Sequence, residues 1–512
     1  MAPKHSSVPT DLDVLVVGAG LSGIAAGYHL QDKCPGKAYA ILEMRDRMGG
    51  TWDLFRYPGV RSDSDMHTLG YAFRPWHDSI SLADGPSILQ YIEDTAAEFG
   101  IDEHIHYGQR VEGARWSSET ATWTTTVRDM ALGELHEVRS RYLYMCSGYY
   151  DYEEGYRPDF EGTGDFEGEI IHPQFWPEDR TYAGKKVVVI GSGATAVTLV
   201  PAMAETAGHV TMLQRSPTYV LSIPGEDPAA AFLRRKLPKP AAETAIRWKN
   251  ILFALGFYKW ARAMPERSRK WILKQVKTAL GGAAPIEPHF SPDYDPWDQR
   301  LCFVPDGDLF EAIKAGKASV VTDHIDRFTE KGILLESGEE LEADIIVTAT
   351  GLKLKMLGGL NFDIDGKEVQ PSDVTLYKGT MLSDVPNFGF AIGYTNASWT
   401  LKCDLCCEYF CRLINHMDSR GYTTVTPREP ADLGEESALP LASGYIQRAQ
   451  HLLPKQGDRA PWKLYQNYAI DKAWLKLAPV KDSALEFTRA PRPGARPKSE
   501  GRSAENASAR VQ

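Results

Sequence analysis

The chain reads Val14-Leu-Val-Val17-Gly18-Ala-Gly20-Leu-Ser-Gly23 close to its start. A short apolar run, a glycine-rich turn and a segment of helical character form the first half of a βαβ unit. In such a unit Gly18 permits a tight turn, Gly20 lets the backbone approach a pyrophosphate, and Gly23 lets helix and strand pack closely. The N-terminus of the helix adds N–H groups for the phosphates. The stretch therefore predicts a dinucleotide site.

An acidic residue completes this first unit. Glu43 follows Gly23 by 20 residues, at the end of the next predicted strand. Its carboxylate can accept hydrogen bonds from a ribose diol, and it repels a 2′-phosphate. The first site is therefore predicted to bind FAD or NAD rather than NADP.

A second unit begins with the apolar run Val187–Ile190 and continues in a GxGxxA variant of the same turn. This turn contains Gly191, Ser192, Gly193, Ala194, Thr195, Ala196 and Val197. At the position where the first unit has Glu43, the second has Arg215 and Ser216. Arginine presents a bidentate fork to a 2′-phosphate, and the serine adds a donor. The second site is therefore predicted to bind NADPH in preference to NADH.

Two dinucleotide sites in one chain predict an α/β fold with two Rossmann-like domains and a helical insertion. The apolar strands at 142–148 and 344–351 both end in glycine, and each is expected where the chain crosses between the domains. The predicted segments are an FAD-binding domain at 9–150 plus 352–485, an NADP-binding domain at 151–222 plus 298–351, a helical insertion at 223–297 and a disordered tail at 489–512. The tail is rich in Pro, Gly, Ser and Ala, which cannot bury enough surface to fold.

Composition sets further bounds. A chain of 512 residues with 43% hydrophobic and 24% charged residues is typical of a soluble protein of two or three domains. No apolar run approaches the roughly 18 residues that suggest a transmembrane helix, and the N-terminus has no signal-peptide core. We therefore expect a cytoplasmic protein. The net charge of −11 argues against nucleic acid as a partner.

Four of the seven cysteines cluster at Cys403, Cys406, Cys407 and Cys411. A metal site needs further ligands at suitable spacing, and the sequence has no second Cys/His cluster to supply them. The spacing instead places the four along a helical face, where cysteine packs as a small apolar residue. No metal site is predicted.

Residues 49–63 resemble a signature of flavin monooxygenases, [AG]GxWxxxx[FY]P[GM]xxxD, position for position. The resemblance places Trp52 and Asp63 beside a flavin, with Arg61 and Ser62 near the bound nicotinamide nucleotide. On resemblance alone, further FAD-contacting positions are Ser22, Thr51, Asp53, Leu54 and Val111.

The stretch between the two glycine turns has the spacing FxGxxxHxxxWP, with Phe166, Gly168, His172, Trp176 and Pro177 at the fixed positions. This spacing resembles the fingerprint of Baeyer–Villiger monooxygenases, and the chain is most similar to the ethionamide-activating group among them. The resemblance implies that His172 acts in the linker through domain movement rather than through proton transfer. Trp176 and Pro177 are expected to stiffen the same linker.

Residues 295–308 resemble the segment that presents the active-site arginine of this family, here Arg300. The resemblance implies that NADPH reduces FAD, that O2 forms a flavin C4a-peroxide, and that this peroxide converts a ketone to an ester or lactone. A sulfide is an expected second substrate. The peroxide must stay anionic, and Arg300 keeps its charge at neutral pH. Asp63 is expected to orient Arg300.

Three other functions stay open at this point. N- or S-hydroxylating flavin monooxygenases share both glycine turns, but their linker usually lacks the Trp-Pro pair. A disulfide reductase needs a redox CxxC pair near the flavin, and Cys403 and Cys406 form the one candidate. A non-catalytic redox flavoprotein does not explain Arg300 within its motif. The physiological ketone and the oligomeric state stay open as well.

Residues 231–280 break the acidic trend of the chain. They contain 13 Lys and Arg against Glu243 and Glu266, a local balance of +11, so the remainder of the chain is near −22. Aromatic residues alternate with these cations. One interpretation is a helical insertion with its aromatics turned inward; the other is a basic amphipathic surface that contacts anionic lipid.

Overall fold

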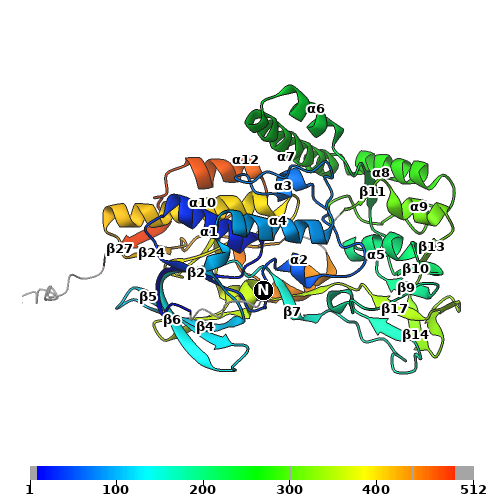
Figure 1. Ribbon diagram of the computed structural model, residues 1–512, viewed down its shortest axis with the longest axis horizontal. Helices are drawn as coiled ribbons and strands as arrows, with labels where there is room; N and C mark the ends of the chain where they lie inside the picture. Colours follow the sequence, from blue (N-terminus) through cyan, green and yellow to red (C-terminus); the bar gives the residue numbers. More distant parts are fainter. Residues whose placement is uncertain (1–7, 300, 440–442, 490–512) are drawn as a thin grey trace, which may run out of the picture.

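The computed structural model describes residues 8–299, 301–439 and 443–489. Its two largest sheets, each covered by helices, confirm the predicted α/β class (Figure 1). The four apolar strands expected from the sequence lie in β1 (Asp11–Val17), β6 (Leu135–Met145), β9 (Lys186–Ile190) and β17 (Ile345–Thr348).

The larger sheet has a parallel centre and an antiparallel edge. Strand β1 pairs in parallel with β2 (Tyr39–Leu42) and with β6, and the described residues place nine strands in this sheet. Val14 and Val16 face one helical layer, while Leu15 and Val17 face Trp123 on the other side. Burial on both faces explains why the strand reads as an unbroken apolar run. The other strands are β3 (Ile105–His106), β4 (Gln109–Ser117), β5 (Thr122–Asp129), β19 (Asn361–Ile364), β20 (Lys367–Val369) and β23 (Phe388–Phe390).

Three helices cover the first face of the larger sheet: α1 (Leu21–Lys33), α4 (Gly85–Glu98) and α10 (Trp399–Arg420). Helix α1 ends just before Cys34-Pro35, since a residue that precedes proline disfavours helical backbone. Helix α10 ends at Gly421, whose φ of 65° provides a left-handed C-cap.

The smaller sheet is parallel, in the order β13 (Ala318–Thr322), β10 (His209–Gln214), β9, β17 and β8 (Glu169–Ile171). Val187 and Val189 face helices α5 (Ala194–Ala204) and α9 (Asp308–Lys314). Val188 faces the opposite way, toward a meander of β14 (Ile325–Thr329), β15 (Gly332–Leu335) and β16 (Glu340–Glu342).

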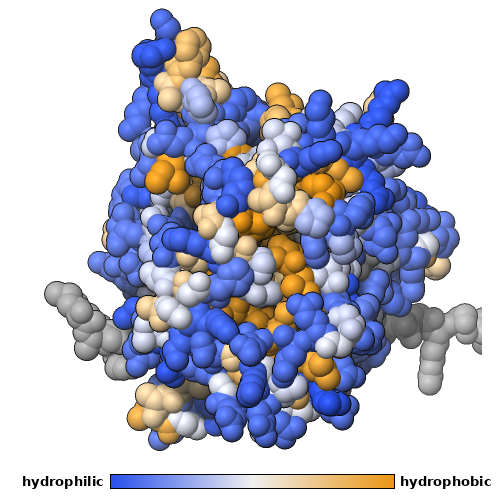
Figure 2. All heavy atoms as spheres, turned by 90° about the vertical axis from the view of Figure 1, so that its right-hand side faces the viewer, coloured by the Kyte–Doolittle hydropathy of each residue, from blue (hydrophilic) through white to orange (hydrophobic). Residues whose placement is uncertain are grey.

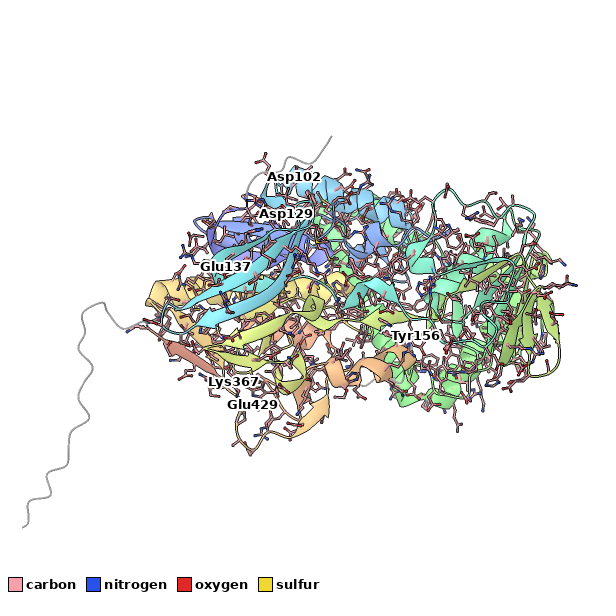
Figure 3. The ribbon with its side chains drawn as sticks, turned by 90° about the horizontal axis from the view of Figure 1, so that it is seen from below. Asp102, Asp129, Glu137, Tyr156, Lys367 and Glu429 are labelled. Atoms are coloured by element: carbon pink, nitrogen blue, oxygen red, sulfur yellow. The ribbon has the colours of Figure 1, made fainter. Side chains whose placement is uncertain are left out.

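Two extended segments connect the sheets. Strand β7 (Tyr150–Gly155) carries the chain away from the larger sheet, and β18 (Leu352–Leu354) carries it back. The two pair antiparallel. Tyr156, directly after β7, lies between the two halves of the molecule (Figure 3).

The segment predicted as a helical insertion contains α6 (Pro228–Lys236), α7 (Lys239–Ala263) and α8 (Pro265–Leu280). Strands β11 (Val220–Ile223) and β12 (Cys302–Pro305) pair in parallel on either side of it. Helices α6 and α7 project beyond the rest of the molecule (Figure 1). Within the described ranges, no helix is long and apolar enough to cross a membrane.

The remaining elements are short. They are α2 (Thr51–Leu54), α3 (Met66–Leu69), α11 (Gly444–Ala449), α12 (Tyr468–Asp471), β21 (Leu376–Tyr377), β22 (Met381–Leu382), β24 (Thr424–Pro427), β25 (Glu435–Ser437), β26 (Lys455–Gly457) and β27 (Leu485–Thr488). Arg489, the first residue of the predicted tail, donates a hydrogen bond to the carbonyl of Arg420 at 2.9 Å. The rest of that tail, 490–512, lies outside the described residues.

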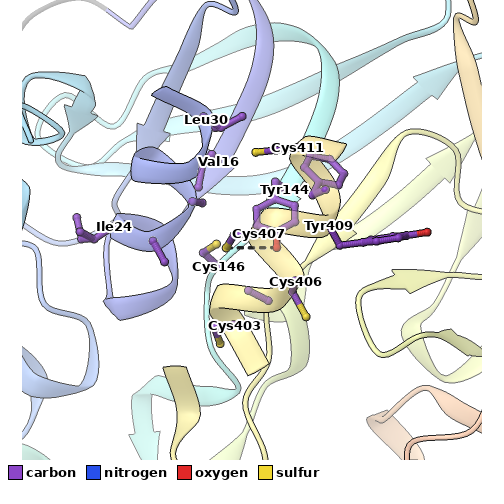
Figure 4. Packing of buried hydrophobic residues seen from close by; sticks show 14 of the residues in the cluster. Val16, Ile24, Leu30, Tyr144, Cys146, Cys403, Cys406, Cys407, Tyr409 and Cys411 are labelled. Carbon is purple, nitrogen blue, oxygen red and sulfur yellow. Dashed lines mark hydrogen bonds between the residues drawn. The ribbon is translucent and has the colours of Figure 1, made fainter. Parts of the chain in front are cut away.

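The four clustered cysteines lie on α10, which confirms the predicted helix, and all are buried in the core against α1 (Figure 4). The Tyr144 hydroxyl donates a hydrogen bond to Cys407 Sγ at 3.5 Å. Burial raises the pKa of the Cys407 thiol well above its usual range, which keeps it protonated. Among the described residues, no group of three or more His, Cys, Asp or Glu side chains could hold a metal ion.

Candidate active site

A cleft of about 350 Å³ opens at the carboxyl ends of the central strands of the larger sheet. Val17, Leu42 and Met145, the last residues of β1, β2 and β6, line it together with the first turn of α5 from the other half of the molecule. In open α/β sheets ligands bind at this edge. The first glycine turn and the start of α5, which follows the second glycine turn, therefore line one shared space.

The first turn is held in place by contacts that exclude side chains. Gly18 has a φ of +103°, and a Cβ atom on it would lie 2.6 Å from the carbonyl oxygen of Cys146. A Cβ on Gly23 would lie 1.9 Å from the carbonyl oxygen of Gly18, so α1 packs directly on the turn. Gly20, the N-cap of α1, lines the cleft with Ser22. The free N–H groups of the helix start are thus directed at the cleft.

Glu43 lines the same cleft and is fixed by the backbone. Its Oε2 accepts a hydrogen bond from the N–H of Ala19 at 2.8 Å, and its Oε1 accepts one from the N–H of Arg45 at 3.0 Å. Burial raises the pKa of the Glu43 carboxyl, and the two N–H donors oppose this shift. Each oxygen keeps a lone pair for a further donor, which suits the hydroxyls of a ribose.

Some of the predicted flavin-contacting residues line the cleft and others do not. Thr51 and Trp52 line the cleft, and so does Val111 on β4. Asp53 and Leu54 are not among the lining residues of the described chain. Asp53 is buried instead between the guanidinium groups of Arg45 and Arg56, with an Oδ1 to Arg56 Nη2 distance of 2.6 Å. In this structure the Asp53 carboxylate therefore connects Arg45 and Arg56 on either side of the turn.

The loop that follows connects the two halves. The Arg61 guanidinium makes a two-point ion pair with Asp308 at the start of α9, with an Nη2 to Oδ1 distance of 3.3 Å. A Cβ on Gly59 would lie 3.0 Å from the carbonyl oxygen of Thr198 on α5. Burial raises the pKa of Tyr57 to about 12, and its hydroxyl pairs with the side chain of Thr195. Arg61 therefore lies where the larger sheet meets the second glycine turn.

Ser62 and Asp63 line the cleft beside Arg61. Arg300, the predicted catalytic cation, lies outside the described residues. The chain immediately beyond it does reach the site, since Cys302 and Phe303 of β12 line the cleft.

The second glycine turn repeats the construction of the first. Gly191 has a φ of +138°, and a Cβ on it would lie 2.4 Å from the carbonyl oxygen of Ala349. Ala196 occupies the third position of the motif, so α5 keeps a Cβ where Gly23 has none. Gly193 is the exposed N-cap of α5, and the residues of the turn that line the cleft are Ala194, Thr195 and Val197.

Arg215 and Ser216 follow the end of β10, and both are exposed. The Ser192 hydroxyl donates to the carbonyl oxygen of Ser216 at 2.9 Å, which joins this pair to the glycine turn. Arg215 makes no ion pair with any residue that the structure describes. Its guanidinium is thus a positive charge that is open to an anion, and the neighbouring Ser216 contacts the glycine turn before α5.

The linker motif surrounds β8 at the edge of the smaller sheet. Phe166 packs edge-on against Phe328, and Trp176 packs in the core on the α5 side. The carbonyl of Pro177 accepts a hydrogen bond from the N–H of Arg180 at 3.1 Å. A Cβ on Gly168 would lie 2.6 Å from the carbonyl oxygen of Asp344.

His172 is buried in the same region and is not among the residues that line the described part of the cleft. Its Nδ1 accepts a hydrogen bond from the N–H of Gln174 at 3.2 Å. Burial lowers the pKa of His172, which favours the neutral ring. The ring lies against Gly155 of β7, so it contacts the segment that connects the two halves.

The sequence analysis did not predict the aromatic residues that form one wall of the cleft. Trp399 Nε1 donates to the hydroxyl of Ser22 at 3.0 Å, and the ring of Tyr149 stacks on Trp399 at a centroid distance of 5.2 Å. Tyr149, Tyr394 and Trp399 also line a second, mostly apolar cavity of about 50 Å³. The position of Tyr149 directly after the strand ending at Gly148 was a usable signal for one of these residues.

The cysteine pair required by a disulfide reductase lies elsewhere. Cys403 and Cys406 are free and buried within α10, and neither lines the cleft in the described structure. The hydroxyl of Ser22 donates to Cys403 Sγ at 3.2 Å, so a cleft residue separates this sulfur from the open space.

Known proteins resemble this chain in sequence and in fold. Residues 16–80 match the family described as NAD(P)-binding Rossmann-like domain. The FAD-containing monooxygenase EthA of Mycobacterium tuberculosis is 52% identical over 484 residues, which are 94% of this chain and 99% of that protein. The probable FAD-binding monooxygenase AlmA of Acinetobacter baylyi is 47% identical over 481 residues, 93% of this chain and 96% of that protein.

Two solved structures share the fold at low identity. An oxidized steroid monooxygenase bound to NADP has a TM-score of 0.73 and 23% identity, covering 94% of this chain and 100% of that one. Cyclohexanone monooxygenase from a Rhodococcus species, bound to NADP+, has a TM-score of 0.71 and 20% identity over the same shares.

Proposed function

This chain belongs to the FAD-containing monooxygenases, and we propose that it is an NADPH- and O2-dependent Baeyer–Villiger monooxygenase. It converts ketones to esters or lactones and also oxygenates sulfides. The observation that carries the proposal is the shared cleft, which is lined by the first glycine turn and by the start of α5, the helix that follows the second glycine turn. A flavin and a nicotinamide can meet there, beside the segment that contains the predicted catalytic arginine.

The first turn and its surroundings fit FAD. The start of α1 at Gly20 offers N–H groups to a pyrophosphate, and Glu43 offers two carboxylate oxygens to a ribose. Thr51 and Trp52 extend the cleft beyond the turn. FAD, when bound there, would supply the two-electron chemistry that activates O2, and the oxygen atom gained by the substrate would come from O2.

The second turn and the exposed pair Arg215 and Ser216 fit the 2′-phosphate of NADPH. The guanidinium is unpaired within the described structure, so it needs no exchange of partners to bind a phosphate. Arg61 is held at the junction of the halves by Asp308, where it can orient the nicotinamide end.

The chain's own contribution to the reaction is charge and the exclusion of water. Arg300, from its sequence motif, supplies a permanent positive charge that stabilises negative charge developing on oxygen. Asp63 lines the cleft, and in this proposal its carboxylate orients that cation. The apolar wall formed by Trp399 and Tyr149 keeps bulk water from the reacting atoms.

The second cavity supports an apolar substrate. It shares Tyr149, Tyr394 and Trp399 with the main cleft, and its other lining residues are mostly aliphatic or aromatic. A ketone bound with its carbonyl in the cleft can place a hydrocarbon chain there. Hydrophobic aliphatic ketones are therefore the substrate class we propose.

The test is product analysis with the FAD-loaded protein, NADPH and air. A linear ketone, a cyclic ketone and an aryl sulfide are compared by gas chromatography with mass spectrometry, and NADPH use is recorded. The proposal predicts ketone-stimulated NADPH oxidation and ester in matching amount. If sulfides or amines stimulate turnover and ketones do not, the alternative of an N- or S-hydroxylating monooxygenase holds instead.

Arg300 is tested in the same assay. Arg300→Ala is expected to abolish ester formation while NADPH still bleaches the flavin. Arg115→Ala, which removes an exposed arginine of β4, is the matched control and is expected to match the unaltered protein. Unchanged ester formation in Arg300→Ala would contradict the role assigned to this residue.

A further inference from the structure

Helices α7 and α8 expose a cluster of large apolar side chains. Leu252 and Phe253 on α7 are 60% and 70% exposed, unusual values for such residues. We call the cluster the α7–α8 patch; it contains the exposed residues Leu252, Phe253, Met264 and Trp271 and the half-buried Phe257 and Trp260 between them.

The patch is one continuous surface. Phe253, Phe257, Trp260 and Met264 follow each other at intervals of four, three and four residues, so they form one stripe of α7 and its C-cap. The ring of Phe257 lies 6.4 Å from that of Phe253 and 6.2 Å from that of Trp271 on α8. The rings of Trp260 and Trp271 are 5.9 Å apart, nearly perpendicular. The two helices thus present a joint aromatic face.

Cations border this face. On α8 the exposed residues Arg267, Lys270, Lys274 and Lys277 repeat at helical spacing, and Trp271 lies between Arg267 and Lys274. None of the four makes an ion pair with any other described residue. Other cations of the region are already neutralised, such as Arg262 by Asp298.

The rest of the molecule carries the opposite charge. Residues 231–280 have a balance of +11, and the remaining chain is near −22. Asp102, Asp129, Glu137 and Glu429 all lie in the half of the molecule formed by the larger sheet (Figure 3). An anionic surface repels that half and attracts the helical segment, so it selects one orientation.

We propose that the α7–α8 patch docks the protein on the surface of a membrane containing anionic phospholipid. The apolar side chains enter the boundary between headgroups and acyl chains, and the lysines and arginine contact the phosphates. The contact is peripheral, since no described helix can span the bilayer. A second copy of the chain is the poorer occupant, because two patches of like charge would face each other.

The shape of the molecule suits such a contact. Helices α6 and α7 project from the body (Figure 1), and the projection at the top of Figure 2 carries both apolar and hydrophilic residues. A projecting surface can reach a bilayer before the acidic body does.

The opposite face of α7 contacts the wall of the cleft. Ile251, next to the exposed Leu252, is buried against Tyr394, which lines both cavities. One helix therefore separates the membrane surface from the proposed substrate site. This benefit of docking rests on the proposed function: the cleft would lie beside the bilayer, in which a hydrophobic ketone dissolves.

The experiment is flotation of the full-length, FAD-loaded protein with vesicles of phosphatidylcholine alone or mixed with phosphatidylglycerol. We expect flotation with the mixed vesicles, and a decrease as salt is raised. Phe253→Ser with Trp271→Ser removes the apolar contact, and Lys270→Glu with Lys274→Glu reverses two charges. Since each neutralised cation near an anionic surface changes binding by about fivefold, the charge variant is expected to lose binding by at least 25-fold, roughly.

Matched controls lie outside the patch. Leu132→Ser removes a side chain that is 71% exposed in the turn before β6, and Lys367→Glu reverses an exposed charge on β20 (Figure 3). Both controls are expected to float like the unaltered protein. Turnover of a water-soluble ketone or sulfide is measured for every variant and is expected to be unchanged, so loss of flotation is separable from failure of the proposed function.

Three results would overturn the proposal. These are no flotation at low salt, equal flotation with neutral vesicles, or equal loss in the controls. Sedimentation velocity gives the remaining outcome: a protein that self-associates through the patch and ignores vesicles has a second copy as its occupant.

Discussion

Gly155 and His172 are in direct contact: a Cβ atom on residue 155 would lie 2.1 Å from Cε1 of the His172 ring. Gly155 ends β7, which leaves the larger sheet, and His172 follows β8 at the edge of the smaller sheet. The linker histidine therefore packs on the connection between the two halves. His172 is only 2% exposed, so a substrate cannot reach its ring in this structure.

Gly155→Ala is expected to force the histidine ring or β7 to move. Overpacking of this kind costs about 1–3 kcal/mol, so the midpoint of thermal unfolding should fall. Gly164→Ala is the matched control, since a Cβ on Gly164 meets open space in the same linker. Scanning fluorimetry of both proteins measures the difference. Equal midpoints would show that the contact between Gly155 and His172 is loose in solution.

His172 also predicts a dependence of stability on pH. Burial lowers the pKa of His172 in the folded protein, while an unfolded histidine binds a proton near pH 6.5. Below about pH 6.5 the unfolded state therefore binds more protons, so His172 reduces stability as the pH falls and has no effect above that range.

His172→Gln removes this proton uptake. We expect the unfolding midpoint of the variant to fall less between pH 7 and pH 5.5 than that of the unaltered protein. His451→Gln, at an exposed histidine, is the control and should follow the unaltered protein. Parallel curves for all three proteins would mean that the His172 ring takes up its proton in the folded state.

Arg215→Ala tests the choice of nicotinamide nucleotide. Hydrogen bonds to a charged group contribute about 1.5–3 kcal/mol, so KM for NADPH should rise about 10- to 100-fold. KM for NADH should change little, because NADH has no 2′-phosphate. Lys317→Ala removes an exposed cation just before β13, the strand that pairs with β10, and is the control. A rise in KM that is equal for both nucleotides would contradict a phosphate contact.

A substitution in the first glycine turn can reduce flavin binding without an effect on folding. A Cβ on Gly20 would have its nearest neighbour, Gly50 Cα, at 3.5 Å, an ordinary contact, so Gly20→Ala should leave the apoprotein within about 0.5 kcal/mol of its stability. The same methyl group occupies space needed by a pyrophosphate, so FAD affinity should fall at least about tenfold.

Gly18→Ala is the contrasting variant. Its Cβ meets a carbonyl oxygen at 2.6 Å and its φ is +103°, so the apoprotein itself should lose about 1–3 kcal/mol. Fluorescence titration with FAD and thermal unfolding of the apoproteins measure both effects. If both variants lost affinity and stability together, the turn would have no separable role in binding.

The parts of the fold that local sequence controls could be predicted. Each glycine turn lies within about 20 residues of its strand and its helix. The acid of the first unit and the cation of the second are found at the same position, after the strand that follows the helix. The α/β class with two nucleotide domains follows from these units. The hydrogen bond between Trp399 and Ser22 could not be predicted in this way, because 377 residues separate the two and no periodic pattern links them.

Asp53 shows a second limit. The flavin-monooxygenase signature predicts a flavin contact for it, and the structure adds that its carboxylate pairs with both Arg45 and Arg56, which the motif does not indicate. A motif fixes residue types and spacing, but the face that a side chain presents depends on partners supplied by the folded chain. The contact of Ile251 with Tyr394 likewise depends on how α7 packs, which its amphipathic sequence alone does not determine.

The most direct test of the proposed reaction is a single turnover with isotopically labelled oxygen. The FAD-loaded protein is reduced with NADPH under anaerobic conditions and then mixed with ¹⁸O2 and a hydrophobic aliphatic ketone. We predict an ester that carries one ¹⁸O atom, formed in an amount equal to the reduced flavin. Unchanged ketone together with an equivalent of labelled hydrogen peroxide would contradict the assignment as a Baeyer–Villiger monooxygenase.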